Sequence, residues 1–254
     1  MIIIPARLES TRFKEKIIYP IGGIPMIVRT AFVALKTGHE VVVAADDLKI
    51  VDICKSNQIE CILTSKHHQS GSERLAEAIQ ILGLADNEII INVQGDEPFL
   101  EPHVINDLHC YLDSLLRDFK TVPLSQTPVL MASAYKKISL QQARDPNFVK
   151  VVLDKNQYAL YFSRSLIPFV RENPEEISYY GHLGIYGYRA DFLQHFCSLP
   201  IPHLEQYERL EQLRVLHYGY NIAMLEVESH SFGIDTMQDL QCALQMFNVK
   251  EEEY

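Results

Sequence analysis

The chain has 254 residues, of which 23 are basic and 33 acidic, so its formal net charge of −10 disfavours general binding to nucleic acid or to a membrane surface. Hydrophobic residues make up 47% of the sequence, enough for one large packed α/β core. The five cysteines are widely spaced and form no C-x-x-C pair, which argues against a disulfide framework or a zinc site and predicts a cytoplasmic protein.

The first part of the chain alternates short apolar strands with helical patterns. We expect strands at residues 1–5, 40–45, 59–63 and 88–93, and helices at 25–37, 47–56 and 72–83. Continuous apolar strands separated by helices predict a parallel sheet covered on both faces. Such sheets bind ligands at the carboxyl ends of their strands, so the segments after the first and fourth strands are candidate sites.

The loop after the first strand carries an unusual cluster of cations. Residues 6–16 hold four basic and two acidic side chains, whereas the chain as a whole is acidic. Neither glycine-rich phosphate motif is present, but Arg7 and Lys16 can bind phosphate through charge-assisted hydrogen bonds. A solvated surface loop is the alternative. The position after the first strand favours a small anionic ligand.

Two aspartates are candidates for holding Mg²⁺. Asp96 follows the fourth strand, where a carboxylate introduced by Gly95 could bind the ion together with substrate phosphates, although a turn would also explain it. Asp235 could cap the last helix instead. Thr236 and Asp239 can form that cap, however, which leaves Asp235 free.

The second part of the chain has a different texture, and it predicts an antiparallel insertion in the α/β body. We expect a hairpin, a further strand, a helix, a returning strand and a final helix, at 149–164, 181–189, 203–217, 221–227 and from Thr236. The predicted division is a nucleotide-binding body, an insertion and a return to the body, at residues 1–134, 135–217 and 218–254; the family resemblance described below implies sugar binding and dimerisation for the insertion.

Glu211 lies in the predicted helix over 203–216. At 100° per residue it falls between Leu204 and Tyr207, inside an apolar sector. A buried carboxylate is costly unless it is paired or used. Arg214, three residues further on, could pair with it. The alternative is that Glu211 points into a polar substrate pocket.

Other polar side chains give weaker signals. His67 and His68 are adjacent, so we interpret them as loop residues rather than as a metal pair. His182 lies in a predicted strand and could contact an acid or a hydroxyl. Arg164 fits a carboxylate clamp or a surface position, and Tyr186 fits strand packing.

Several motifs together resemble the 3-deoxy-manno-octulosonate cytidylyltransferase family, in the family's order from residue 2 to about 245: PARLESTRFKEK, HQSGSERLAEAI, NVQGDEPF, VKVVLDKNQYALYFSR, GHLGIYGYR, LEQLRVL and GIDT. The resemblance implies a Rossmann-like nucleotidyltransferase body with a mainly parallel sheet. It also implies transfer of CMP from CTP to 3-deoxy-D-manno-octulosonate (Kdo) for lipopolysaccharide biosynthesis, with Mg²⁺ as cofactor and a homodimer as the assembly.

The same resemblance assigns roles to residues. Arg7 and Lys16 match cations that bind the triphosphate, and Asp96 and Asp235 match metal-binding aspartates. The positions matching the segment near the cytidine are Gln69, Ser70 and Arg74. Those matching the Kdo pocket are Gln94, Arg164, His182, Tyr186, Glu211 and Gln212.

The first loop departs from the family pattern. The usual S-T-R-L-P-G-K is replaced by a segment with Lys14 and Glu15 in place of Pro-Gly. The exchange removes one fixed φ and one residue free to take a positive φ, so it bears on loop rigidity and CTP affinity. Loop length and Lys16 are preserved, and we expect phosphate contact to survive.

Two other activities are compatible with the sequence, and a third is disfavoured. One is a nucleotidyltransferase for a related acidic sugar such as 8-amino-Kdo, and another is a CTP-binding relative that has lost turnover. A glycosyltransferase would require an Asp-x-Asp metal motif, which Gly95-Asp96-Glu97 does not supply. The small-molecule partners we expect are CTP and Kdo, with no nucleic acid and no membrane.

Overall fold

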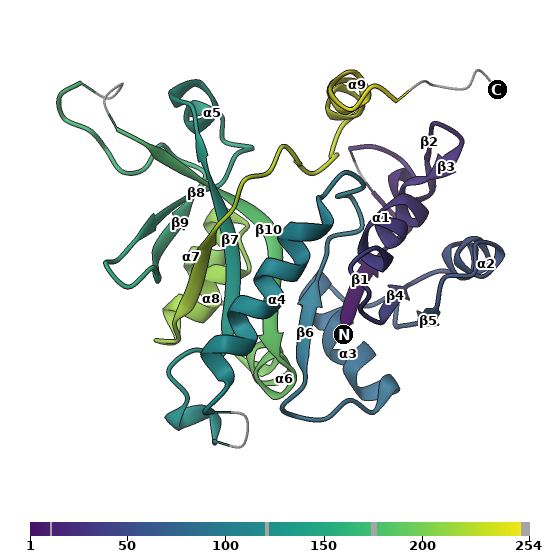
Figure 1. The fold of residues 1–254 in the computed structure, drawn as a ribbon, viewed down its shortest axis with the longest axis horizontal. Coiled ribbons are helices and arrows are strands. Elements are labelled where there is room, and N and C mark those ends of the chain that lie inside the picture. Colours follow the sequence, from purple (N-terminus) through teal and green to yellow (C-terminus); the bar gives the residue numbers. More distant parts are fainter. Residues whose placement is uncertain (11, 120–121, 174–176, 250–254) are drawn as a thin grey trace.

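The computed structural model describes residues 1–10, 12–119, 122–173 and 177–249, and it is organised around one nine-stranded sheet (Figure 1). The main strand order is β11-β7-β10-β6-β1-β4-β5, and β8 and β9 branch from β10. The strands are β1 (Ile2–Ala6), β4 (Val41–Ala45), β5 (Cys61–Leu63), β6 (Ile89–Asn92), β7 (Met131–Ile138), β8 (Lys150–Leu153), β9 (Ala159–Ser163), β10 (Tyr179–Arg189) and β11 (Ile222–Glu226).

The sheet is mainly parallel, as the sequence predicts. β6, β1, β4 and β5 run in one direction, and β7 and β11 are parallel to each other. β10 runs against both β6 and β7, and the β8–β9 hairpin extends the antiparallel part. The predicted α/β class with antiparallel strands is therefore confirmed.

Helices cover both faces of the sheet, because its central strands are apolar on both sides. Ile2 and Ile4 pack in a core with α1 and α4, whereas Ile3 packs in a second core with α3 and α6 on the other face. The helices are α1 (Met26–Leu35), α2 (Leu48–Ser56), α3 (Gly71–Leu82), α4 (Pro102–Leu116), α5 (Leu140–Arg144), α6 (Ala190–Ser198), α7 (His203–Glu208), α8 (Gln212–His217) and α9 (Met237–Met246). Short elements complete the fold: η1 (Lys16–Ile18), β2 (Pro20–Ile21), β3 (Ile24–Pro25) and η2 (Leu124–Gln126). No helix in the described part of the chain is long and apolar enough to cross a membrane.

The insertion is attached to the central sheet rather than separated from it. The predicted boundary after residue 134 falls within β7, and β10 connects the sheet to the β8–β9 hairpin. Inside the insertion the Lys150 ammonium is buried and donates to the carbonyl oxygens of Asp145, Phe148 and Arg164. The division into body, insertion and return stays a prediction, with no break in the sheet to mark it.

The prediction of one continuous helix over 203–217 is wrong. The chain forms α7 and α8, and between them Arg209 adopts a left-handed conformation with φ of 55°. Leu204 and Tyr207 are 41% and 78% exposed, so the apolar sector inferred around Glu211 does not exist. Because the helix breaks at Arg209, the orientation of α8 is independent of that of α7. A single helical period therefore cannot describe both helices.

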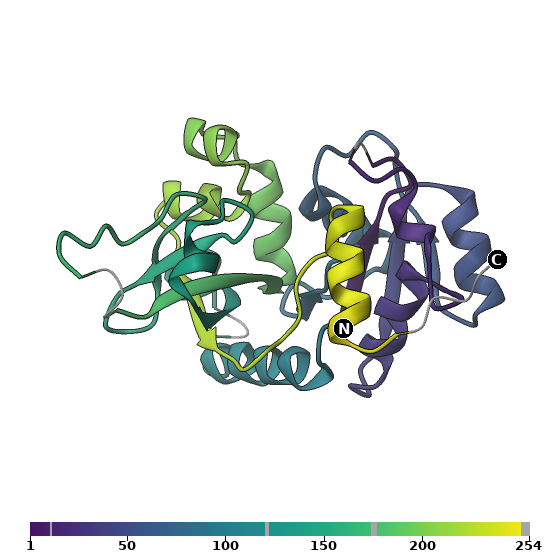
Figure 2. The ribbon, with the colours of Figure 1, turned by 90° about the horizontal axis from the view of Figure 1, so that it is seen from above.

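The last part of the chain crosses back from β11 to the side of the sheet that carries β1. After β11, residues 227–236 run without regular structure to α9, which lies over the first elements of the chain (Figures 1 and 2). Thr236 caps α9 in a reciprocal capping box with Asp239, as predicted. Asp235 is therefore available for other contacts.

Candidate functional site

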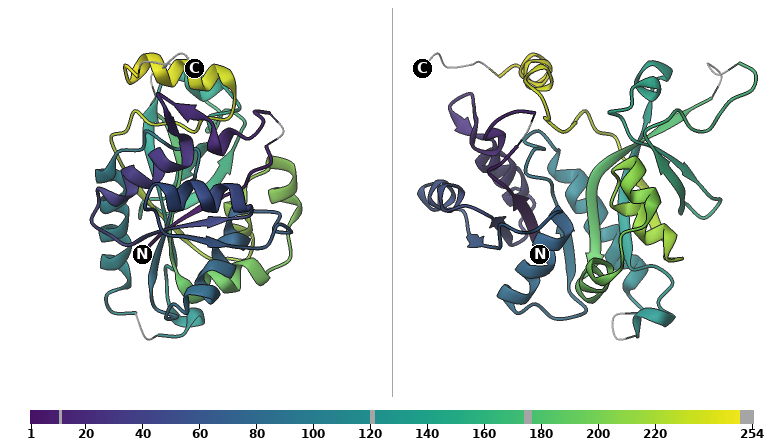
Figure 3. Two further views of the ribbon diagram at one scale, coloured as in Figure 1. Left: turned by 90° about the vertical axis from the view of Figure 1, so that its right-hand side faces the viewer. Right: turned by 180° about the vertical axis from the view of Figure 1, so that it is seen from behind.

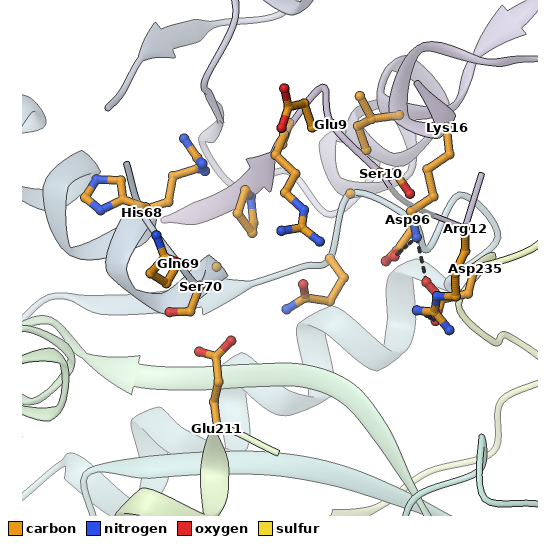
Figure 4. A pocket seen from close by; sticks show the side chains of 18 residues that line it. Glu9, Ser10, Arg12, Lys16, His68, Gln69, Ser70, Asp96, Glu211 and Asp235 are labelled. Carbon is orange, nitrogen blue, oxygen red and sulfur yellow. Dashed lines mark hydrogen bonds and ion pairs between the residues drawn. The ribbon is translucent and has the colours of Figure 1, made fainter. Parts of the chain in front are cut away.

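A polar pocket of about 290 Å³ lies at the carboxyl ends of β1 and β6. Its walls come from the loop after β1, the start of α3, the turn after β6, the start of α8 and the end of the 227–236 connection (Figure 4). Among the residues that the structure describes, the predicted site residues that line the pocket are Arg7, Lys16, Gln69, Ser70, Arg74, Gln94, Asp96, Glu211 and Asp235. The two loops that sequence analysis singles out therefore meet in one cavity.

Lys16 joins the two aspartates at one end of the pocket. Its ammonium lies 2.6 Å from Asp96 Oδ2 and 2.7 Å from Asp235 Oδ1, and it donates to the Ile234 carbonyl at 3.0 Å (Figure 4). Arg12 contacts the other oxygen of Asp235 at 2.8 Å. Residues far apart in the sequence thus form one compact group of two cations and two carboxylates.

Charge pairing keeps this group ionised. Burial favours a neutral Lys16, but the charge of Asp96 and the hydrogen bonds that Lys16 donates to both aspartates outweigh it and raise the Lys16 pKa. Burial acts to raise the pKa of Asp235, but the hydrogen bond and charge of Lys16, with Arg12, lower it overall. In this arrangement the cations are suited to bind an anionic ligand, and the carboxylates are suited to bind the counter-ion of that ligand.

The donor atoms around the Lys16 ammonium fit a hard divalent cation. They are carboxylate and carbonyl oxygens from Asp96, Asp235 and Ile234, and Mg²⁺ is typically bound by one or two carboxylates together with substrate phosphates and water. The described residues contain no group of three or more His, Cys, Asp or Glu side chains that could hold a metal alone. This donor set suits an ion that arrives with its substrate.

In the first loop, the residue that stands where the family pattern has glycine adopts a conformation that glycine favours. Glu15 takes φ of 50° and ψ of 31°, in the left-handed region. The backbone N–H of Lys16 donates to the Phe13 carbonyl, and Lys49 pairs with the Glu15 side chain at 3.1 Å. The loop thus contains one strained residue at this position.

The start of α3 forms the opposite end of the pocket. Ser70 caps the helix by accepting from the backbone N–H of Glu73, and the backbone N–H of Gln69 donates to the Glu73 carboxylate. The Arg74 guanidinium is buried and donates to Thr64 Oγ1 at 2.7 Å, with Asp46 3.6 Å away. Arg74 therefore supports the wall of the pocket through contacts on the neighbouring strand ends.

Sequence analysis missed His68, which lines this end of the pocket. Its Nε2 pairs with Glu77 at 2.5 Å, and its Nδ1 lies 3.8 Å from Glu73. The interpretation of His68 as an ordinary loop residue is incomplete, because the helix that follows supplies two carboxylates to its ring. The motif HQSGSER contained both His68 and Glu73, but the spacing alone did not show that they meet.

Glu211 projects from the start of α8 toward Ser70, across the pocket from the loop after β1 (Figure 4). Burial raises its pKa, whereas the hydroxyls of Ser72 and Ser70 act in the opposite direction. Glu211 Oε2 and Gln212 Nε2 are buried and have no hydrogen-bond partner among the described residues. Unpaired buried polar atoms are rare in folded proteins and indicate a place for a polar ligand.

Of the two alternatives left open for Glu211, the structure shows the pocket position and not the pairing with Arg214. Arg214 is bound by Glu205 through two hydrogen bonds of 2.7 and 2.6 Å, and its guanidinium lies over the Phe196 ring. The bidentate geometry matches the planar guanidinium to one carboxylate. Glu211 is left without a cation and remains oriented to the pocket.

The other predicted sugar-binding residues lie outside the described lining of this pocket. Arg164 donates from Nε to the Glu208 carbonyl at 2.8 Å and from Nη1 to the Pro146 carbonyl at 3.1 Å. Tyr186 donates to Gln212 Oε1 at 3.3 Å. His182 Nε2 lies 2.9 Å from Ser133 Oγ, and burial lowers the His182 pKa to about 3. Tyr186 and Gln212 thus extend the wall behind Glu211.

Comparisons with known proteins agree with this geometry. The sequence profile of a family described as Cytidylyltransferase matches residues 1–224. A 3-deoxy-manno-octulosonate cytidylyltransferase from Wolinella succinogenes is 55% identical over 249 residues, covering 97% of this chain and 99% of that protein. One from Helicobacter pylori strain G27 is 48% identical over 251 residues, covering 98% of each.

A solved structure shows the same architecture. It is that of CMP:2-keto-3-deoxy-manno-octonic acid synthetase complexed with CTP, and it superposes with a TM-score of 0.85. The two sequences are 38% identical, and the match covers 97% of both chains. The similarity therefore extends through the body and the insertion.

Proposed function

Because the chain belongs to the 3-deoxy-manno-octulosonate cytidylyltransferase family, we propose that its pocket transfers CMP from CTP to Kdo and releases pyrophosphate. One observation carries this assignment for the chain's own residues. Asp96 and Asp235 converge on Lys16 at one end of a polar cavity, and Glu211, which has one buried unpaired oxygen, lines the same cavity. An anionic nucleotide and a polar sugar can both be bound there.

In this reaction the anomeric hydroxyl oxygen of Kdo attacks the α-phosphorus of CTP. A new O–P bond forms, the bond to the β,γ-diphosphate breaks, and the hydroxyl proton is lost. Arg7 and Lys16 lie where they can bind the triphosphate and stabilise the charge that develops on pyrophosphate. Without these cations, the two anionic substrates would repel one another in a confined site.

Asp96 and Asp235 are the residues that would hold Mg²⁺. When bound, the ion supplies positive charge to the phosphate oxygens and lowers the pKa of a coordinated hydroxyl. Lys16 now satisfies both carboxylates, so metal binding requires its ammonium to give up at least one of these contacts. The phosphates of CTP are suitable new partners for that ammonium.

Glu211, Gln212 and Tyr186 form the part of the wall that we assign to the sugar. Glu211 Oε2 can accept from a Kdo hydroxyl, and Gln212 Nε2 can donate to one. Tyr186 holds the other end of the Gln212 amide. Two unpaired polar atoms with opposite hydrogen-bonding character select for a polyhydroxylated ligand over an apolar one.

The family resemblance also suggests a homodimer, with the insertion as the contact region. Five large apolar side chains of the insertion region are at least 41% exposed: Leu160, Phe169, Ile201, Leu204 and Tyr207. Exposed apolar groups of this size favour a protein interface. Light scattering on the intact protein tests the dimer, and Tyr207→Lys is expected to weaken it. We assign the enzyme to lipopolysaccharide biosynthesis in the cytoplasm.

The decisive experiment measures pyrophosphate release by the purified protein with CTP, Mg²⁺ and Kdo. We expect turnover that requires all three and is lost on chelation of the metal. A parallel reaction with 8-amino-Kdo or another acidic sugar identifies the preferred substrate. Tight CTP binding by calorimetry with no pyrophosphate released from any of these sugars would contradict the proposed activity.

A further inference from the structure

The connection between β11 and α9 ends in one of the two site aspartates. Residues 227–236, here called the strap, carry Asp235 from the insertion side of the molecule to the nucleotide-binding side (Figures 1 and 3). The strap contains no helix or strand, and its backbone N–H groups pair with neighbouring segments at its two ends, Val227 with Tyr135 and Ile234 with Asp96. The path of the residues between these ends depends on other contacts.

Three ionisable side chains bind the strap at residues 229–231, ahead of the contacts that Lys16 and Arg12 make at its end: Glu97, Glu101 and Lys136, here called the clasp. The Glu101 carboxylate accepts from Ser229 Oγ at 2.6 Å and from the backbone N–H of His230 at 2.8 Å. Glu101 directly precedes α4, so this contact anchors the strap to the first residues of a long helix.

The other two members of the clasp meet at Ser231. Glu97 Oε2 accepts from the Ser231 hydroxyl at 2.6 Å, and Lys136 Nζ donates to the Ser231 carbonyl at 2.7 Å and to the Ser229 carbonyl at 3.0 Å. Ser231 is 2% exposed, so these are interior contacts. Hydrogen bonds to charged partners in such surroundings are stronger than neutral ones at the surface.

The clasp is directly connected to the reactive end of the pocket. Glu97 follows Asp96 in the chain, and the backbone N–H of Ile234 donates to the Asp96 carbonyl at 3.0 Å. The Ile234 carbonyl in turn accepts from Lys16. The strap backbone at Ile234 therefore contacts both Asp96 and Lys16. A shift of the strap at Ser231 would move Asp235 relative to Asp96 by disturbing these contacts.

Burial of Ile234 alone does not explain the arrangement. Ile234 is fully buried in a small apolar cluster with Phe13, Ile21 and Leu240, which holds the end of the strap but leaves the position of residues 228–231 open. Lys136 and both glutamates make their contacts in that earlier segment. Removing ionisable side chains from water costs free energy. Their use to hold this loop therefore indicates that the path of the loop matters.

We propose that Glu97, Glu101 and Lys136 are positioning residues that set the placement of Asp235 against Asp96, an inference that rests on the proposed function of this pocket. None of the three lines the cavity. They act through Ser229, His230 and Ser231, and Ser229 and Ser231 are each bound by two of them. The clasp thus links the insertion side, through β7, to the geometry of the metal-binding aspartates.

The test compares Lys136→Met with Lys137→Met in the full-length enzyme. Lys137 is the next residue of β7, but it is exposed and pairs with Glu226 at the surface, so it is a matched control. We expect Lys136→Met to lower kcat about tenfold or more, with a smaller change in KM for CTP, and to raise the Mg²⁺ concentration needed for half-maximal turnover. Lys137→Met should remain within about twofold of the original enzyme.

Two further measurements do not depend on turnover. Electron paramagnetic resonance of Mn²⁺ with CTP present should show weaker metal binding in Lys136→Met, and amide hydrogen exchange should accelerate in residues 229–235. If wild-type protein releases no pyrophosphate, the proposed function fails, yet these two measurements still judge the clasp. Unchanged Mn²⁺ affinity together with unchanged exchange in the strap would overturn it.

A double-mutant cycle tests the central contact with a milder change. Glu97→Leu and Ser231→Ala each remove one side of the same hydrogen bond, because Leu offers no acceptor and Ala no donor. We expect each to weaken Mn²⁺ binding several-fold, and the double variant to be no weaker than the more affected single variant. Fully additive losses would show that Glu97 acts independently of Ser231 and would refute its assignment as a positioning residue.

Discussion

The nucleotide-binding body and the insertion differ in how many of their predicted site residues line the pocket. In the body every predicted residue, from Arg7 to Asp96, lines the pocket, as does Asp235 at the end of the strap. In the insertion only Glu211 does so among the described residues, while Arg164 and His182 bind other parts of the protein. The predicted site residues of the body therefore gather in the pocket, whereas most of those in the insertion do not.

The difference lies in the geometry of the two halves of the sheet. Parallel strands place their carboxyl ends at one edge, so residues that follow β1 and β6 must converge there. In the antiparallel insertion, neighbouring side chains alternate between faces and find partners across strands. Arg164, at the end of β9, is bound there by the Glu208 and Pro146 carbonyls. Position in the chain therefore predicts which residues line the pocket in the body, but not in the insertion.

The largest expected effect comes from breaking the body's aspartate pair. Asp235→Asn removes the charge that Lys16 and Arg12 contact, and we expect kcat to fall about 10³-fold because one of the two carboxylates proposed to hold Mg²⁺ beside the phosphates is lost. Pyrophosphate release at limiting Mg²⁺ measures the loss. Asp239→Asn, in the capping box of the same segment, is the control and should retain turnover. Near-normal activity of Asp235→Asn would remove Asp235 from the site.

A pair of glutamates sharpens the comparison within the insertion. Glu211→Gln should raise KM for Kdo by about 10-fold or more and increase thermal stability, since a buried unpaired carboxylate is costly. Glu208 binds Ser163 Oγ and the Arg164 N–H, so Glu208→Gln should lower stability and leave KM for Kdo nearly unchanged. Steady-state kinetics and calorimetry distinguish the two. Equal KM values for both variants would contradict the assignment of Glu211.

Arg164→Met separates structure from sugar binding at the residue where the resemblance and the contacts diverge. Loss of its hydrogen bonds to two carbonyls should cost about 2 kcal/mol of unfolding free energy, measured by urea denaturation. The conservative Arg164→Lys variant should recover part of that loss. A rise of KM for Kdo beyond about tenfold in both variants would instead assign Arg164 to the sugar carboxylate.

His182 makes the insertion sensitive to acid. Its pKa is lowered by burial from 6.5 to about 3, so below pH 6.5 the unfolded chain takes up a proton that the folded chain does not. Stability is therefore complete above that pH and falls as the pH decreases toward 3. The expected loss is about 2 kcal/mol between pH 7 and pH 5. Urea denaturation of His182→Gln at both pH values should show a smaller loss, and an equal one would contradict the prediction.

The smallest expected effect concerns the strained residue of the first loop. Glu15→Gly places glycine at a φ of 50° and should stabilise the protein by about 0.5–1 kcal/mol, since the lost surface pair with Lys49 contributes little. CTP affinity by calorimetry should rise slightly or stay unchanged. Glu9→Gly, in the same loop, is the control. A destabilised Glu15→Gly variant would mean that the Lys49 pair outweighs the backbone strain.

Local sequence patterns were sufficient for most of the fold. Strand and helix bounds in the first ninety residues agree with prediction to within about two residues, and the Thr236–Asp239 cap was expected and is present. These features depend on apolar periodicity and on side chains a few positions apart. The break at Arg209 was missed because it depends on contacts that α7 and α8 make separately with the rest of the protein.

The sequence by itself determined that two strand-end loops, one basic and one acidic, would meet at the edge of a parallel sheet. Only the tertiary structure decided that Arg214 pairs with Glu205, that Glu211 stays unpaired, and that the clasp holds the strap behind Asp235. The physical reason is the range of the interactions. Backbone periodicity is encoded in neighbouring residues, whereas the choice of a charged partner depends on which distant segments share a buried volume.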